Sequence, residues 1–231
     1  MKKTKMLSLM MVVVMMTSFL IGCGADSDKT PADADTIKVG LNYELSGNVA
    51  SYGTDLSDGV EMALEEINAN GGVLGKQIEV VKMDNTSDST EAANISTRLI
   101  TRENVVTILG PATSGNTKGA IPPAQENKIP LVSASATADD VTVDSNGKVR
   151  DYIFKTCFSD SYQGVTMANF AYNDLKLAKA AVLVENTSDY SKGIAANFKD
   201  ELAKLGGTIV SEEAYQSKET DFKAVLTNIK A

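Results

Sequence analysis

The chain has 231 residues, of which 43% are hydrophobic, and a formal net charge of −8. It contains no histidine, so it cannot form a Ser-His-Asp triad, a Cys-His dyad or a histidine zinc site. Its acidic balance also argues against a partner as negatively charged as nucleic acid. Catalysis by carboxylates or lysine alone is left open by composition, but we expect no enzyme.

The first 22 residues have the pattern of a cleaved export signal. A basic start at 2–5 precedes an uncharged, mostly apolar run that is shorter than the ~20 residues of a membrane-spanning helix. The run ends in Leu20-Ile21-Gly22-Cys23, which resembles the bacterial lipoprotein box. The resemblance implies that residues 1–22 are removed and that Cys23 is lipidated, which would anchor the protein to a membrane. The alternative is an ordinary secretory signal with an incidental cysteine.

Residues 23–35 are small and acidic and show no hydrophobic pattern, which predicts a flexible linker. Removing the three lysines of the signal changes the formal charge to −11, since 19 basic residues then face 30 acidic ones. The chain has two cysteines, so a lipidated Cys23 leaves Cys157 without an intramolecular partner. We therefore expect a fold that is stabilised by its core, with Cys157 as a small buried residue.

From residue 36 onward, short β-rich runs alternate with segments of helical periodicity. The predicted strands are 36–41, 77–83, 104–109, 129–133, 151–156, 180–184 and 208–210. The predicted helices are 55–70, 88–102, a segment that runs to 127, 161–176, 190–205 and 221–229. Pro122-Pro123 should start a new turn or kink the third of these. The alternation predicts an α/β fold of βαβ units, with parallel strands covered by helices on both faces.

The order helix, Gly-Gly, strand at 67–80 recurs at 202–210, which predicts two lobes of similar architecture. The first lobe spans 36–156. The second, 157–231, is partial and ends within a helical pattern, so we expect a fragment of a longer precursor. Two such lobes on either side of a cleft are a common ligand-closing design, with the hinge expected near 157–161.

Ligands of open parallel sheets bind beyond the carboxyl ends of the strands. Four loops occupy this position, 42–53, 110–117, 133–137 and 185–190, and they are rich in small and hydroxyl residues. The backbone N–H groups at 114–117 begin a helix, where an anion such as a carboxylate is favoured. The alternative is that these residues only cap helices and form turns.

Two partial motifs argue against a nucleotide and a metal. The loop 110–117 has glycines at P-loop spacing, but Asn116 stands where the phosphate-binding lysine is required. Residues 84–88 alternate like the start of a calcium loop, yet Ile95 occupies the place of the bidentate glutamate. We expect a strand-to-helix loop with a cap at 84–88, and no cofactor.

Three blocks resemble the branched-chain amino-acid-binding proteins of ABC importers. They are 37–88 with "LSGNVASYGTD", 107–137 with "GPATSGNT" and "SASAT", and 152–170 with "FSDSYQG", and the resemblance extends over 36–231. It implies the type I periplasmic-binding fold, with two Rossmann-like lobes of parallel sheets joined by a hinge. It also implies an extracytoplasmic solute-binding lipoprotein. Such a protein delivers an amino acid, branched-chain or otherwise aliphatic, to an ABC permease and ATPase complex.

The resemblance also implies a ligand-binding set: Tyr52, Ser114, Ser135, Ala136, Thr137 and Tyr190. Ser114, Ser135 and Thr137 would hold the ligand α-carboxylate, and the Ser135 carbonyl would accept from the α-ammonium. Tyr52 would pack over the ligand, and Tyr190 would close from the second lobe. In the family, the carboxylate that pairs with the ammonium lies further along the sequence than Ala231.

Three alternatives are left open by the sequence. Glu44 adds a carboxylate near the expected cleft, either as a solvated loop charge or as a residue that alters ligand preference. The same fold could serve as a receptor or sensor for an amide, urea or another amino acid. The protein could lie on the outer face of the cell membrane, as in Gram-positive bacteria, or in a periplasm. A surface hydrolase is disfavoured by the absence of histidine.

Overall fold

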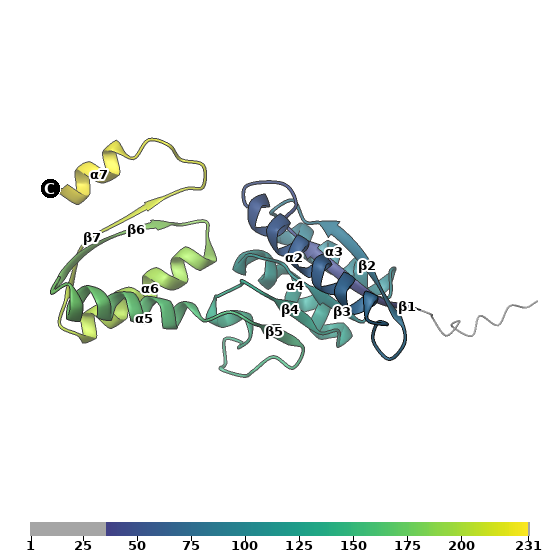
Figure 1. The fold of residues 1–231 in the computed structure, drawn as a ribbon. Helices are drawn as coiled ribbons and strands as arrows, with labels where there is room; N and C mark the ends of the chain where they lie inside the picture. Colours follow the sequence, from purple (N-terminus) through teal and green to yellow (C-terminus); the bar gives the residue numbers. More distant parts are fainter. Residues whose placement is uncertain (1–35, 231) are drawn as a thin grey trace, which may run out of the picture. The chain divides into compact units, whose positions relative to one another are not determined.

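A computed structural model describes residues 36–230, so the predicted signal, the linker and Cys23 lie outside the described residues. The described chain contains two parallel sheets with helices packed on them (Figure 1). Strands and helices alternate along most of it, as the periodicity predicted. No helix among these residues is long and apolar enough to span a membrane.

The first sheet has five strands in the order β2-β1-β3-β4-β5, and all of its pairings are parallel. Its strands are β1 (Thr36–Tyr43), β2 (Gln77–Asp84), β3 (Thr107–Leu109), β4 (Leu131–Ser133) and β5 (Ile153–Lys155). The helices that connect them are α2 (Ala50–Ala69), α3 (Ser89–Thr101) and α4 (Ser114–Asn127). A single 3-10 turn, η1 (Asp139–Val141), lies between β4 and β5. The connections therefore bring the loops after β1, β3 and β4 to one edge of the sheet.

Two apolar clusters form the core of this sheet, one associated with α2 and the other with α3 and α4. The first joins Leu64 of α2 to Leu41 and Tyr43. The second includes Leu99 of α3 and Ile108 of β3, both fully buried. Burying a leucine or isoleucine side chain contributes about 1.5–3 kcal/mol, so these clusters fix the positions of the strand ends.

The second sheet pairs β6 (Lys179–Glu185) with β7 (Thr208–Tyr215) in parallel. Its helices are α5 (Asp160–Asn169), extended by a π-helical turn η2 (Phe170–Asp174), and α6 (Asp189–Lys204) and α7 (Lys223–Lys230). Figure 1 shows α5 and α6 on one side of this sheet and α7 on the other. The two helices α5 and α6 approach closely at Gly164, where an added Cβ would lie 2.7 Å from the Asn197 Cβ.

Two local predictions were wrong, and one of two alternatives at Pro122-Pro123 is excluded. No new helix starts at these prolines, because the packing of the buried residues Ala120, Ile121 and Ala124 outweighs the loss of two N–H donors, and the kink stays a prediction. Strand β3 begins at Thr107, three residues later than expected. The predicted helix 161–176 ends as an α-helix at Asn169 and continues as the π-helical turn.

Candidate ligand-binding site

The site is built around the N-terminus of α4. Thr113 precedes the helix with the extended backbone of an N-cap residue, φ −90° and ψ 152°, but its side chain makes no capping hydrogen bond. Instead, the Thr113 hydroxyl donates to Glu44 Oε1 at 2.8 Å. The first N–H groups of a helix have no intrahelical partner, so those of α4 are left without a side-chain cap.

Glu44, at the end of β1, has an exposed fraction of 0%. Its carboxylate accepts from Ala112 N at 2.9 Å, Thr113 N at 3.0 Å and Asn116 Nδ2 at 2.8 Å, in addition to the Thr113 hydroxyl. The alternative of a solvated loop charge was therefore wrong, because three donors from the β3–α4 loop and one from the first turn of α4 occupy this carboxylate. Burial, with a contribution from the Glu44 charge, raises the pKa of the adjacent Tyr43 to about 12.

The loop after β4 is joined to the loop after β3. Ala138 N donates to Ser114 Oγ at 3.2 Å, and the Ser135 hydroxyl donates to the Ala112 carbonyl at 2.6 Å. The Ser133 hydroxyl donates to the Pro111 carbonyl at 2.6 Å. The structure thus brings Ser114 together with the loop that carries Ser135, Ala136 and Thr137.

Two buried hydroxyls in these loops have unused hydrogen-bonding capacity. Ser114 is 3% exposed and Thr137 6%. Ser114 Oγ accepts from Ala138 N, and its own proton has no acceptor among residues 36–230. Thr137 Oγ1 makes no hydrogen bond of good geometry in the same part of the chain, although it lies near enough to the Asp160 carboxylate to lower the pKa of that group. Buried polar groups are normally satisfied, so this pair is suited to a polar ligand group.

The two predicted aromatic residues lie on other helices. Tyr52, in the first turn of α2, is 65% exposed, and Tyr190, in the first turn of α6, is 41% exposed. The Tyr190 hydroxyl is 3.4 Å from Gln163 Nε2. Within the described residues, no hydrogen bond joins either ring to Ser114 or to the loop after β4. The packing of the two rings over a ligand stays a prediction.

Lys118 connects α4 to α6, which the sequence analysis missed. Its Nζ lies 2.6 Å from Asp140 Oδ2 and 2.9 Å from Asp189 Oδ2, and Asp189 precedes Tyr190. Partial burial works against the ammonium, but the hydrogen bonds to Asp140 and Asp189 raise the pKa of Lys118 overall. Hydrogen bonds from Lys192, and then from Lys118, lower the pKa of Asp189 despite partial burial. Both partners are distant from Lys118 in sequence, so no local pattern could have revealed this contact.

The β2–α3 loop holds the loop after β1 in place. Asp84 Oδ1 accepts from Leu45 N at 2.9 Å, Ser46 N at 3.1 Å and Thr86 N at 2.8 Å. Partial burial opposes ionisation, but these hydrogen bonds lower the pKa of Asp84 overall. Asp88 accepts from Glu91 N at 2.8 Å and caps α3, so the prediction of a capped strand-to-helix loop at 84–88 is confirmed.

Asp160 is a second residue that the sequence analysis missed. It is fully buried at the start of α5, its N–H donates to the Thr137 carbonyl at 2.9 Å, and neither carboxylate oxygen makes a hydrogen bond of good geometry among the described residues. Burial raises the pKa of Asp160, the neighbouring Thr137 hydroxyl opposes this shift, and the charge of Asp139 adds to it. An added Cβ at Gly193 of α6 would lie 2.4 Å from Asp160 Oδ2, so this position of α6 has no room for a larger residue.

Cys157 is half-buried, so the expectation of a buried residue was wrong. Its thiol forms no disulfide, and burial raises its pKa. It follows β5 by two residues and lies before α5, in the segment where the hinge is expected.

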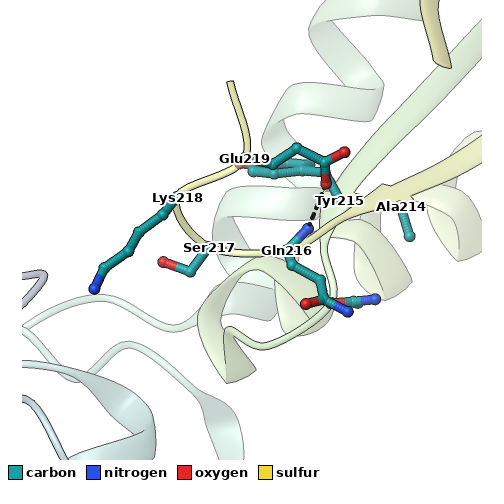
Figure 2. A pocket seen from close by; sticks show the side chains of 7 residues that line it. Ala214, Tyr215, Gln216, Ser217, Lys218 and Glu219 are labelled. Atoms are coloured by element: carbon teal, nitrogen blue, oxygen red, sulfur yellow. Dashed lines mark hydrogen bonds between the residues drawn. The ribbon is translucent and has the colours of Figure 1, made fainter. Parts of the chain in front are cut away.

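A hollow of about 590 Å³ lies at the carboxyl ends of β6 and β7. It is lined by Asn186 and by residues 214–219, and Figure 2 shows Lys218 pointing away from the other labelled side chains. The Gln216 N–H donates to Glu219 Oε2 at 3.2 Å across the turn. None of the predicted ligand-binding residues lines this hollow. The hollow resembles the cluster around Ser114 only in lying at the carboxyl ends of parallel strands.

Comparisons with known proteins point to one family and one fold. Residues 36–231 match the model of a family described as periplasmic binding protein. The Leu/Ile/Val-binding protein of Escherichia coli K12 is 29% identical over 215 residues, which cover 92% of this chain and 56% of that protein. The chain spans about half the length of the relatives it matches.

Two solved structures share the fold. One is the branched-chain amino acid transporter substrate binding protein LivJ from Streptococcus pneumoniae in complex with isoleucine. It is 44% identical with a TM-score of 0.77, and the match covers 85% of this chain and 54% of that one. The other is a solute binding protein of an ABC transporter from Rhodopseudomonas palustris in complex with 3,4-dihydroxybenzoic acid. It is 25% identical with a TM-score of 0.74, covering 85% of this chain and 52% of that one.

Proposed function

The chain belongs to the periplasmic binding protein family, and we propose that the whole protein is an extracytoplasmic solute-binding protein of an ABC importer. We propose that its ligand is a branched-chain or other aliphatic amino acid. Relatives named as Leu/Ile/Val-binding proteins and the isoleucine complex of the S. pneumoniae protein support this ligand class. The two separate sheets support a division into lobes at 36–156 and 157–231.

The observation that carries the proposal is the uncapped N-terminus of α4 beside two buried hydroxyls. Free N–H groups at a helix N-terminus favour an anion, and Ser114 has a proton to donate. The ligands named for the S. pneumoniae and R. palustris proteins both carry a carboxyl group. We propose that the α-carboxylate binds at Ser114, Ser135, Thr137 and the first turn of α4, with the Ser135 carbonyl accepting from the α-ammonium. Tyr52 and Tyr190 would then cover the apolar part of the ligand.

Calorimetry on the full-length protein tests the ligand class. Leucine, isoleucine and valine should release heat on binding, whereas leucinamide, which lacks the carboxylate, should bind at least ~100-fold more weakly. The reason is that charge-assisted hydrogen bonds contribute about 1.5–3 kcal/mol each, and 1.4 kcal/mol is a factor of ten in affinity. Binding of an amide or urea without binding of the three amino acids would contradict the proposal and favour the amide or urea receptor instead.

We propose that Cys23 is lipidated and tethers the mature protein, through the linker 23–35, to the outer face of a membrane near its permease. The support is the sequence pattern of residues 1–23. Replacing Cys23 with alanine should move the protein from the membrane fraction to the soluble fraction and leave leucine affinity unchanged. Fractionation with detection of the protein checks this, and continued membrane association of the variant would refute the lipid anchor.

A further inference from the structure

Glu44 is not among the proposed ligand-binding residues, yet all four of its hydrogen-bond donors belong to the β3–α4 loop and the first turn of α4. Its two oxygens act only as acceptors, from Ala112 N, Thr113 N, the Thr113 hydroxyl and Asn116 Nδ2, at 2.8 to 3.0 Å. An unpartnered charge at this depth would cost stability, and these donors remove that cost. The Glu44 carboxylate therefore fixes the conformation of the β3–α4 loop.

The arrangement around Glu44 changes the hydrogen bond that the Thr113 side chain makes. Threonine is a favoured N-cap residue and the Thr113 backbone is extended, as a cap requires. Two other helices of the described chain are capped in this way. In α3, the Asp88 carboxylate accepts from Glu91 N at 2.8 Å, and in α6, the Ser188 hydroxyl accepts from Ser191 N at 3.2 Å. In α4, the corresponding bond from Asn116 N to the Thr113 hydroxyl is not made, because that hydroxyl is turned toward Glu44.

Asn116 is held in the same way. It is the third residue of α4, and its side chain donates to Glu44 Oε1 as well. Glu44 therefore binds the side chains at the start and at the end of the first turn of α4 and directs them away from the N–H groups of Ser114, Gly115 and Asn116, which have no acceptor among the described residues. Ser114 begins this turn and its proton has no acceptor in the same part of the chain, and the buried Thr137 hydroxyl lies in the loop that donates to Ser114 Oγ.

We propose that Glu44 is a positioning residue that keeps the N-terminus of α4 uncapped, so that a ligand carboxylate takes the place of the Thr113 hydroxyl. The identity of the ligand rests on the proposed function, whereas the effect of Glu44 on Thr113 does not. Glu44 does not contact the ligand in this proposal. Its effect is to prevent an internal cap from competing with the ligand for the same N–H groups.

Crystal structures of the ligand-free full-length protein test the proposal without any ligand. In Glu44→Ala, the acceptor of the Thr113 hydroxyl is removed, so the loop is expected to release Thr113. The Thr113 hydroxyl should then turn and accept from Asn116 N. An unchanged Thr113 rotamer in this variant would overturn the proposal. Failure of the wild-type protein to bind any amino acid would refute the proposed function but leave this test intact.

Leucine affinity gives the second test. Glu44→Ala should weaken leucine binding at least ~10-fold, because the Thr113 hydroxyl would lose its acceptor and would now occupy the N–H groups. Thr113→Val, which cannot cap, should keep leucine affinity within ~3-fold of wild type while Glu44 is present. In the double variant Glu44→Ala/Thr113→Val, most of the affinity should return. A purely structural role of Glu44 predicts no such rescue, so its absence would overturn the proposal.

Asp88→Ala is the matched control, since it removes the N-cap hydrogen bond of the neighbouring helix α3. It should lower the melting temperature and leave leucine affinity unchanged. If Glu44→Ala does not fold, Thr113→Val still decides. A loss of leucine binding in Thr113→Val as large as that expected for Ser114→Ala would show that Thr113 contacts the ligand directly, which contradicts the proposal.

Discussion

Replacing Gly53 with alanine is expected to lower the free energy of unfolding by about 3 kcal/mol, the upper part of the range for an overpacked site. An added Cβ would lie 2.1 Å from the Glu44 carbonyl oxygen and 2.7 Å from the Glu44 backbone nitrogen. Both are backbone atoms of a buried residue, so no rotamer change can relieve the contact. The first turn of α2, which carries Tyr52, must move away from the end of β1. Urea unfolding of the full-length protein measures the effect.

Gly59→Ala is the control in the same helix. No atom lies within 4 Å of the Cβ that this change would add. Since glycine in a helix interior costs about 0.5–1 kcal/mol relative to alanine, this variant should gain that amount of stability. A similar stability change in the two variants would contradict the close packing of α2 on Glu44.

The alternation of strands and helices could be predicted from the sequence because burial gives each type of element its own period. Strand β1 shows the limit of this rule, since its residues from Val39 to Tyr43 are buried without alternation by helices on both faces. Helix α4 shows another limit. Its two prolines indicate a break when considered locally, but the burial of Ala120 and Ala124 decides the conformation. Local propensity is a weak prior wherever tertiary packing opposes it.

The position of the candidate site could be predicted from topology, but the hydrogen bonds and close contacts within it could not. The rule that ligands bind at the carboxyl ends of parallel strands located the loops after β3 and β4. The role of Glu44 depends on donors 68 to 72 residues away in the chain. Asp160 likewise meets Thr137 and Gly193 only through the fold. A single sequence contains no local signal for such contacts, so the partners of Glu44 and the place of Asp160 had to be found in the structure.

Ser114→Ala is expected to weaken leucine binding by 10- to 100-fold. The Ser114 oxygen already accepts from Ala138 N, so its proton remains for a ligand carboxylate. Losing one charge-assisted hydrogen bond costs about 1.5–3 kcal/mol, and each 1.4 kcal/mol is a factor of ten. Calorimetry with leucine and with leucinamide measures the change. The loss should be larger for leucine than for leucinamide, because the amide carbonyl of leucinamide accepts only a neutral hydrogen bond, which contributes less than a charge-assisted one.

Ser133→Ala provides the comparison that separates ligand contact from loop support. Ser133 is also a buried serine whose oxygen accepts a backbone N–H of the same loop, from Ala136 at 3.1 Å. Its own proton is used inside the protein, in the 2.6 Å bond to the Pro111 carbonyl. Ser133→Ala should therefore cost more stability than Ser114→Ala and much less leucine affinity. If the two variants lost affinity equally, Ser114 would act only by supporting the loop, and the carboxylate would have to bind elsewhere on this edge of the sheet.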